Sequence, residues 1–311
     1  MTRPGPPLRT LLFAGGHDED GIRAAYASGA DAVMIDLEEP RTPFPEPDRE
    51  ATRKLVAEFL ASVADDQRPL VFARVQPPSS GQTLKDLRAV LTRRLTGILL
   101  PKVHGPADVH GADALLTCME VELGLSPGSV AIYPILETAQ AIRLAYDIAV
   151  ASPRVRYLGG AVSRFGDIHQ ALGYRWSADG EETLFLRSKV LVDARAAGIR
   201  YPISGMWGGA TDDLDGLWAW AVHLRDLGYY GMMLGHAGHV ALVHEIFTPS
   251  RDDIEYWRAL DRLAADAERT GTGPITYGDP GQGEGHVVHI AHVGSARQNL
   301  QWARDLGLDV D

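Results

Sequence analysis

Short apolar runs alternate with segments of helical periodicity along almost the whole sequence, and this alternation limits the folds open to the chain. Continuous runs of valine, isoleucine and leucine are typical of buried parallel strands, and helical segments between them are typical of βα units. The expected strands cover residues 8–14, 31–37, 69–75, 96–102, 129–136, 154–160, 200–206 and 229–235. Amphipathic helices are expected between them, for example over 48–64 and 180–198.

Eight such units predict an α/β fold, a (β/α)8 TIM-type barrel, with an open doubly wound sheet as the alternative. Open sheets that bind dinucleotides carry G-x-G-x-x-G after the first strand, and FAGGHDEDG (13–21) lacks this spacing. We expect a barrel catalytic domain over 1–246 and a C-terminal helical extension over 247–311. The extension is too long to belong to the barrel, so we expect it to pack over the barrel mouth or on a neighbouring subunit.

Charge and cysteine content narrow the classes of partner. The formal net charge is −11 over 311 residues, so the overall field repels nucleic acid and anionic membranes. The single cysteine, Cys118, rules out a disulfide within the chain and fits a reducing compartment. No window approaches the ~18 apolar residues of a membrane span, and the first ten residues lack the apolar core of a signal peptide. We expect a soluble, cytoplasmic protein.

The residues that end the expected strands are the candidates for the active site, because such barrels form their sites at the C-terminal strand ends. They are Asp36, Glu38, Glu39, Arg74, Lys102, Glu137, Ser163, Arg164, Asp167 and His236. Any one of them is equally well explained by a surface ion pair. Acids and bases gathered on one face together indicate a functional site.

Glu137 and Asp167 are the sharpest pair among these candidates. Two carboxylates at adjacent strand ends suit a hard, oxygen-preferring cation, Mg²⁺ or alternatively Mn²⁺, that acts as a Lewis acid on a carbonyl or enolate oxygen. Arg74 ends a buried strand, where an unpaired charge is costly, so we expect it to contact a carboxylate of the protein or of the substrate. This combination predicts chemistry on a 2-oxo acid or a thioester enolate.

The same segments resemble the HpcH/HpaI aldolase and citrate lyase superfamily, in its citrate lyase β-subunit-like, malyl-CoA lyase-like branch. The matching stretches run in order along nearly the whole chain and include LRTLLFAGG, ASGADAVMIDLEEP, FARVQPP, GILLPKVHGPADV, IYPILETAQAI and RVRYLGGAVSRFGDIHQALG. The resemblance implies a modified (β/α)8 barrel that assembles as a homotrimer or homohexamer. It also implies an enzyme that makes or breaks a C–C bond between a 2-oxo acid and an enolate, often that of an acyl-CoA.

The resemblance also implies roles for the acids and for Arg74. Glu137 of ILETA and Asp167 of GDIHQALG correspond to the Mg²⁺ ligands. Arg74 of ARVQ corresponds to the arginine that binds the substrate carboxylate. Asp36 and Glu38 of DLEEP correspond to acids that hold metal-bound waters and supporting residues.

For the substrate and for CoA, the resemblance points to the rim of the barrel. Backbone amides around Gly160 and Ala161 correspond to the anchor of the oxo acid, and Arg164 of the same loop is a further substrate-binding candidate. Arg9 and Lys102 correspond to positions on the side where CoA phosphates approach. The turn AGG replaces a common VPG, and GHAGHV follows the eighth strand where a His-Pro pair is common.

The leading hypothesis is a Mg²⁺-dependent C–C lyase or aldolase that acts on a 2-oxo acid or hydroxy acid, with a CoA ester as a candidate substrate. A thioester hydrolase, or an aldolase that uses free acids, would use the same site. A non-catalytic metabolite-binding barrel is the alternative from another class.

His286, His289 and His292 stand three residues apart near the C-terminus. Their spread is poor geometry for one metal ion, and a packed or interfacial helix is the preferred interpretation. Related sequences of the lyase branch read Gly-Lys-Met-Val-Asp here, and that Asp approaches the active site of a neighbouring subunit. The resemblance therefore implies that His289 takes the place of the Asp and serves in proton transfer.

Overall fold

The computed structural model describes residues 5–63, 68–160, 162, 164–271, 275–278 and 285–310. The chain divides into two compact units, Met1–Phe247 and Thr248–Asp311. In the described part of the chain, no helix combines the length and the apolar character that crossing a membrane requires.

The first unit is a TIM-like α/β fold, which confirms the predicted fold class. Its strands are β1 (Thr10–Gly15), β2 (Ala32–Asp36), β3 (Leu70–Arg74), β4 (Leu95–Leu100), β5 (Ala131–Leu136), β6 (Gly159–Gly160), β7 (Ile203–Ser204) and β8 (Gly231–Leu234). They follow the order β6-β5-β4-β3-β2-β1-β8-β7, and every neighbouring pair is parallel. The expected strands over 154–160 and 200–206 are reduced to two residues each.

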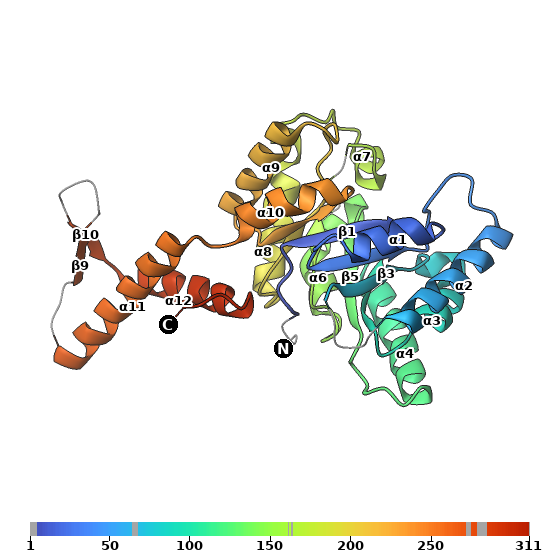
Figure 1. Ribbon diagram of the computed structural model, residues 1–311, viewed down its shortest axis with the longest axis horizontal. Helices are drawn as coiled ribbons and strands as arrows, with labels where there is room; N and C mark the ends of the chain where they lie inside the picture. Colours follow the sequence, from blue (N-terminus) through green and yellow to red (C-terminus); the bar gives the residue numbers. More distant parts are fainter. Residues whose placement is uncertain are drawn as a thin grey trace. The chain divides into compact units, whose positions relative to one another are not determined.

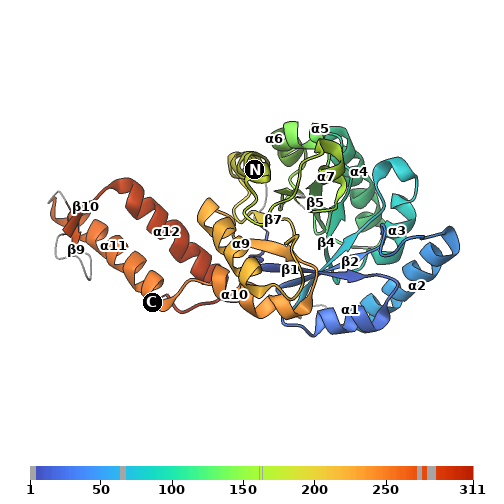
Figure 2. The same ribbon diagram turned by 90° about the horizontal axis from the view of Figure 1, so that it is seen from above.

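Helices connect these strands and lie outside them (Figures 1 and 2). They are α1 (Glu19–Tyr26), α2 (Glu46–Ser62), α3 (Thr83–Val90), α4 (Pro106–Glu122), α5 (Ala139–Arg143), α6 (Ala145–Val150), α7 (Asp167–Leu172), α8 (Leu184–Ala196), α9 (Leu214–Leu227) and α10 (Val240–Phe247). Three short 3₁₀ helices cover Pro78–Ser80, Glu181–Thr183 and Ala237–His239. Because all the strands are parallel, their C-terminal ends meet on one face of the unit.

Side chains alternate along the strands between two apolar cores, as the period of two in a β-strand requires. Met34, Phe72 and Tyr133 point to the interior, where the ring of Tyr133 stacks on Tyr157 with centroids 5.9 Å apart. Neighbouring strand residues such as Val33 and Ile35 face the helices. The interior is filled with side chains, so a ligand of this unit must bind at an end of the strands.

The backbones of β6 and β7 approach each other closely at Gly159. A Cβ atom there would lie 2.2 Å from Oη of Tyr133 and 2.6 Å from the carbonyl oxygen of Ile203. We expect Gly159→Ala to lower the free energy of unfolding by about 1–3 kcal/mol, because an overpacked core must shift or strain. Gly111→Ala is the matched control. Gly111 lies in α4 with open space around it, so its replacement should stabilise the protein by about 0.5–1 kcal/mol. Urea unfolding that moves both midpoints in the same direction would contradict this account.

A buried ion pair fastens α4 to the loop before β6. Arg154 donates from Nη1 to Oε1 of Glu120 (2.8 Å) and from Nη2 to Oε2 (2.6 Å). Glu120 also accepts the backbone N–H groups of Gly128 (2.8 Å) and Val130 (2.9 Å). Burial acts to raise the pKa of Glu120, but the bonds from Arg154 and these amides outweigh it and lower the pKa to about 2.

The second unit contains α11 (Arg251–Thr270), the antiparallel pair β9 (Ile275–Gly278) and β10 (Gly285–Val288), and α12 (Ile290–Asp305). Helix α11 begins with a capping box between Ser250 and Asp253. The unit has apolar clusters of its own, one of which joins Leu260 and Ala264 to Val293 and Ala296. That it packs on a barrel mouth or a neighbouring subunit stays a prediction.

Candidate functional site

Six of the predicted site residues meet at the C-terminal ends of the barrel strands. Asp36 and Arg74 are the last residues of β2 and β3 and lie opposite each other in the ladder. Glu38 follows β2 by two residues, Lys102 follows β4 by two residues, and Glu137 comes directly after β5. Asp167 is the first residue of α7, the helix after β6. These groups belong to successive βα units of the barrel, and the parallel arrangement of the strands brings them together at one end.

Arg74 is held by two protein carboxylates. Its Nε and Nη2 donate to Oδ1 and Oδ2 of Asp36 at 2.7 and 2.8 Å, a bidentate pair, and its Nη1 lies 3.2 Å from Oε2 of Glu38. Asp36 is 0% exposed and also accepts the backbone N–H of Glu38. Burial acts to lower the pKa of Arg74, but Asp36 and Glu38 outweigh it and raise this pKa, so the guanidinium stays charged.

Lys102 lies among the carboxylates that face Arg74. Its Nζ is 2.9 Å from Oε1 of Glu38 and 3.8 Å from Oδ2 of Asp167. Its backbone N–H donates to Oε1 of Glu137 at 2.6 Å. Among the described residues other than glycine, Lys102 alone has a positive φ, 51°. This left-handed conformation is costly for a residue with a Cβ and occurs where the amide binds a buried acid.

The carboxylate cluster, which we define as Asp36, Glu38, Glu137 and Asp167, carries more negative charge than Arg74 and Lys102 neutralise. Burial and the charges of Glu38 and Asp167 raise the pKa of Glu137 to about 7, against the opposing effects of the Lys102 amide and Arg74. Burial also raises the pKa of Glu38, although Arg74 and Lys102 oppose the change. Glu38 and Glu137 are 5% and 6% exposed, so solvent screens this excess charge weakly.

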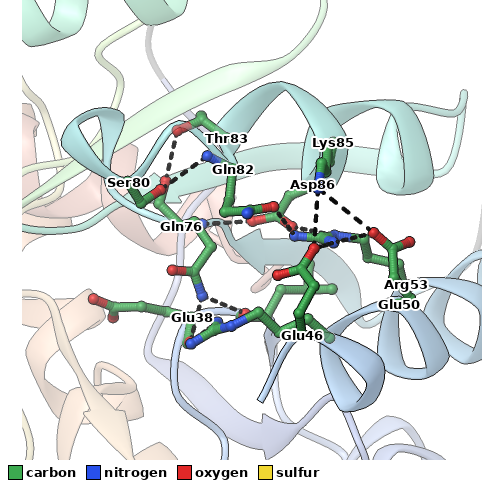
Figure 3. Close-up of polar contacts among 12 residues, drawn as sticks. Glu38, Glu46, Glu50, Arg53, Gln76, Ser80, Gln82, Thr83, Lys85 and Asp86 are labelled. Atoms are coloured by element: carbon green, nitrogen blue, oxygen red, sulfur yellow. Dashed lines mark hydrogen bonds and ion pairs between the residues drawn. The ribbon is translucent and has the colours of Figure 1, made fainter. Parts of the chain in front are cut away.

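A hydrogen-bond network that the sequence analysis did not predict holds the backbone of Glu38 (Figure 3). Nε2 of buried Gln76 donates to the carbonyl oxygens of Leu37 and Glu38, and its backbone N–H donates to Oδ2 of Asp86 at 2.7 Å. The other oxygen of Asp86 accepts Nε of Arg53 at 2.7 Å. The network ties the end of β2 to α2 and α3. Its members, Arg53, Gln76 and Asp86, come from three separate segments of the chain, and no sequence motif indicates that they are in contact.

Several other candidates lie away from the cluster. Arg9 precedes β1 and binds Asp31, which precedes β2, so this pair is at the N-terminal ends of the strands. The structure therefore does not bring Arg9 to the predicted CoA side of the site. Arg164 is exposed, with its guanidinium over the rings of Phe165 (5.0 Å) and Trp176 (5.2 Å). Gly160 of β6 pairs with Leu136 of β5.

The remaining strand-end candidates add no contact to the cluster in the described part of the chain. Glu39 is exposed, and the exposed ring of His236 caps the 3₁₀ helix that follows it. Ala161, a predicted substrate-binding residue, and Ser163 lie outside the described residues.

The three C-terminal histidines do not share one helix. His286 belongs to β10, His289 precedes α12 and His292 lies in the first turn of α12. The exposed rings of His289 and His292 make an edge contact, with centroids 5.5 Å apart. Within the described residues, no group of three or more His, Cys, Asp or Glu side chains could hold a metal ion. The side chain of His286 is outside that set.

Comparison with known proteins agrees with this geometry. The family model described as HpcH/HpaI aldolase/citrate lyase matches residues 9–237, which includes every residue of the carboxylate cluster. The chain belongs to the HpcH/HpaI aldolase/citrate lyase family. The family resemblance inferred from the sequence is thereby confirmed.

Members of this family with different activities are similar to the chain. The citrate lyase subunit beta of Haemophilus influenzae is 29% identical over 273 residues, covering 86% of this chain and 89% of that protein. The (3S)-malyl-CoA thioesterase of Cereibacter sphaeroides is 28% identical over 300 residues, covering 96% of both proteins. One relative is thus named for a lyase and the other for a thioester hydrolase.

Solved structures share the fold. A citrate lyase from Burkholderia xenovorans superposes with a TM-score of 0.79 at 18% identity, covering 100% of this chain and 95% of that one. The CitE protein of Mycobacterium tuberculosis, in complex with magnesium, acetoacetate and coenzyme A, gives a TM-score of 0.67 at 21% identity, covering 98% and 100%. At these identities the likeness establishes the fold.

Proposed function

We propose that this chain is a Mg²⁺-dependent C–C lyase or aldolase that cleaves or forms a bond between a 2-oxo acid and an enolate. The carboxylate cluster carries the proposal. Its four acids face two cations, which leaves an excess of two negative charges when all are ionised, and three of the acids, Asp36, Glu38 and Glu137, are buried. A divalent cation would balance this charge.

The residues present fit Mg²⁺. Glu137 and Asp167 would hold it, because Mg²⁺ uses one or two protein carboxylates and completes its shell with water and substrate oxygens. Oxygen donors from Glu137 and Asp167 suit Mg²⁺ or Mn²⁺ better than a thiophilic metal. When bound, the cation supplies Lewis-acid stabilisation of the negative charge that develops on the oxo-acid or enolate oxygen.

Arg74 is the group we assign to the substrate carboxylate. Asp36 and Glu38 together engage all three of its nitrogens, but Nη1 and Nη2 each carry a second N–H that a substrate carboxylate could accept, and the side chain is 21% exposed. Asp36 in this proposal is a positioning residue, because both its oxygens accept from Arg74 and it is fully buried. Glu38, held by Gln76 and Lys102, is the acid that would support bound water or accept a proton.

We assign binding of the rest of the substrate to the loop that follows β6. The backbone of Gly160 and Ala161 and the side chain of Arg164 are the proposed contacts for the oxo acid. Lys102 is engaged by Glu38 and lies near Asp167, so binding a CoA phosphate would require breaking an ion pair inside the site. We therefore leave Lys102 and Arg9 out of the proposed CoA contacts.

His289 is proposed to act in proton transfer at the site of a neighbouring subunit in a homotrimer or homohexamer. We expect His289→Ala to lower the catalytic rate without weakening Mg²⁺ binding, because an imidazole that moves a proton contributes about 10²–10⁴-fold and does not ligate the cation. Steady-state rates and Mg²⁺ titration calorimetry measure the two effects. The control is His110→Ala, which removes an exposed histidine from α4 and should retain the rate. An unchanged rate in His289→Ala would make this residue a packing residue.

A thioester hydrolase, or an aldolase on free acids, is the second candidate, and the relative named a malyl-CoA thioesterase favours the former. The decisive experiment is a panel of malyl-, citramalyl- and citryl-CoA esters beside free 4-hydroxy-2-oxo acids. Release of a 2-oxo acid together with an acyl product supports the lyase. Release of free CoA without C–C cleavage supports the hydrolase. Calorimetry that detects no binding of Mg²⁺ with oxaloacetate, glyoxylate or pyruvate would instead indicate a non-catalytic barrel.

A further inference from the structure

A cavity lies at the N-terminal ends of the barrel strands, at the end opposite the carboxylate cluster. It has a volume of about 700 Å³ and is lined by residues that begin or precede strands. Leu70 and Leu95 are the first residues of β3 and β4, and Ser129 and Arg156 come shortly before β5 and β6. The cavity is therefore separate from the candidate active site, with the length of the strands between them.

The lining of this cavity is basic. It includes Arg68, Arg93, Arg94 and Arg156, and no aspartate or glutamate among the residues that the structure describes. Thr92, Thr96 and Ser126 also line the cavity and carry hydroxyl groups that can donate hydrogen bonds. Four guanidinium groups around one cavity stand out in a chain whose net charge is −11. We call this set of four the arginine pocket.

Arg94 carries a buried charge without a carboxylate partner in the described part of the chain, whereas Nη1 of Arg68 lies 3.6 Å from Oδ1 of Asp31. Arg94 is 3% exposed, and its Nη2 donates to Oη of Tyr26 (3.1 Å) and to the carbonyl oxygen of Pro69. Its Nε has no hydrogen-bond partner, and among the described residues no carboxylate comes within 4.0 Å of its guanidinium. A buried cation without a counter-charge is costly, and an anion in the adjoining cavity would supply one.

We propose that the arginine pocket binds a small polyanionic metabolite that carries two or more phosphate or carboxylate groups. Several fixed guanidinium groups favour a multiply charged ligand, because each forms charge-assisted hydrogen bonds with its oxygens. Among the described residues no aromatic side chain lines the cavity, so none of them would stack on a nucleobase. The volume falls in the usual range for small-molecule sites.

The test is titration calorimetry of the metal-free full-length protein with sodium pyrophosphate and, separately, with citrate at constant ionic strength. We expect one of them to bind, and the two arms distinguish a phosphate from a carboxylate ligand. Arg68→Gln combined with Arg93→Gln should weaken binding by roughly ten-fold or more, since charge-assisted hydrogen bonds are lost. Both residues are exposed, so the double variant should fold. Arg225→Gln, which removes an exposed guanidinium from α9, should bind as well as the unaltered protein.

Binding must also persist in a Glu137→Gln, Asp167→Asn background, which separates the arginine pocket from the proposed metal site. Equal binding by the double arginine variant and the unaltered protein would overturn the proposal. Absence of binding by either ligand would overturn it as well, and a change in sedimentation of the double variant would then assign the arginines to subunit contact.

Discussion

Glu137→Gln and Asp167→Asn are each expected to abolish Mg²⁺ binding and to lower turnover on the order of 10³-fold or more. Either change removes one of the two carboxylates proposed to hold the cation and half of the excess negative charge of the cluster. The amide in Glu137→Gln keeps the shape of the side chain and an oxygen for the Lys102 N–H, so the barrel should stay folded. Calorimetric titration with Mg²⁺ measures the binding, and the CoA-ester and free-acid panel measures the turnover.

Glu19→Gln is the matched control, because it removes an exposed carboxylate at the start of α1, which follows β1 on the same face of the barrel. It should leave both measurements unchanged. Full activity of the unaltered protein after removal of divalent cations, or Mg²⁺ binding retained by both cluster variants, would refute the assignment of Glu137 and Asp167.

Glu120→Gln is expected to lower the free energy of unfolding at neutral pH by about 1.5–3 kcal/mol, because it removes the charge-assisted hydrogen bonds of the buried partner and leaves Arg154 paired only with the part-exposed Asp113. The cost should depend on pH. The pKa of Glu120 is about 2 in the folded protein, below its ordinary value of 4.5, so its stabilisation is complete above about pH 4.5. It is lost as the pH falls toward 2, and the difference between variant and unaltered protein should shrink over that window.

Urea unfolding at pH 7, 4 and 3 measures this difference. Glu122→Gln is the control, since Glu122 is exposed at the end of the same helix and its replacement should change stability by no more than about 0.5 kcal/mol. A Glu120→Gln protein as stable as the control at pH 7, or a difference that grows on acidification, would contradict the role given to the ion pair.

The sequence predicts the barrel and the core of the candidate site because both follow from periodicity. Buried parallel strands appear as apolar runs, and residues just after those runs must meet on one face. Asp36, Arg74 and Glu137 were found in this way. Arg9 is the instructive contrast. It matched a motif, but it stands before its strand, and a residue on that side of a parallel strand lies at the opposite end of the barrel.

Contacts between polar residues of separate segments could not be predicted from the sequence, because no hydrophobic periodicity relates those residues to one another. Gln76 and Asp86 support Glu38 through hydrogen bonds that depend on how α3 folds back on the end of β2. The four arginines of the arginine pocket come from three loops far apart in the sequence, so no local motif marks them. The ion pair between Lys102 and Glu38 was not predicted either, because the positive φ of Lys102 cannot be read from the sequence.

The backbone conformation of Lys102 also determines what each substitution at this position would change. One residue offers its amide to Glu137 and its ammonium group to Glu38, while its φ of 51° favours glycine. Mutation to glycine would relax the backbone and keep the amide but would discard the cation, and arginine or glutamine would keep the steric cost. In this chain the charge at position 102 can therefore be removed without altering the backbone, so the electrostatics of the site and the fold of the barrel can change independently here.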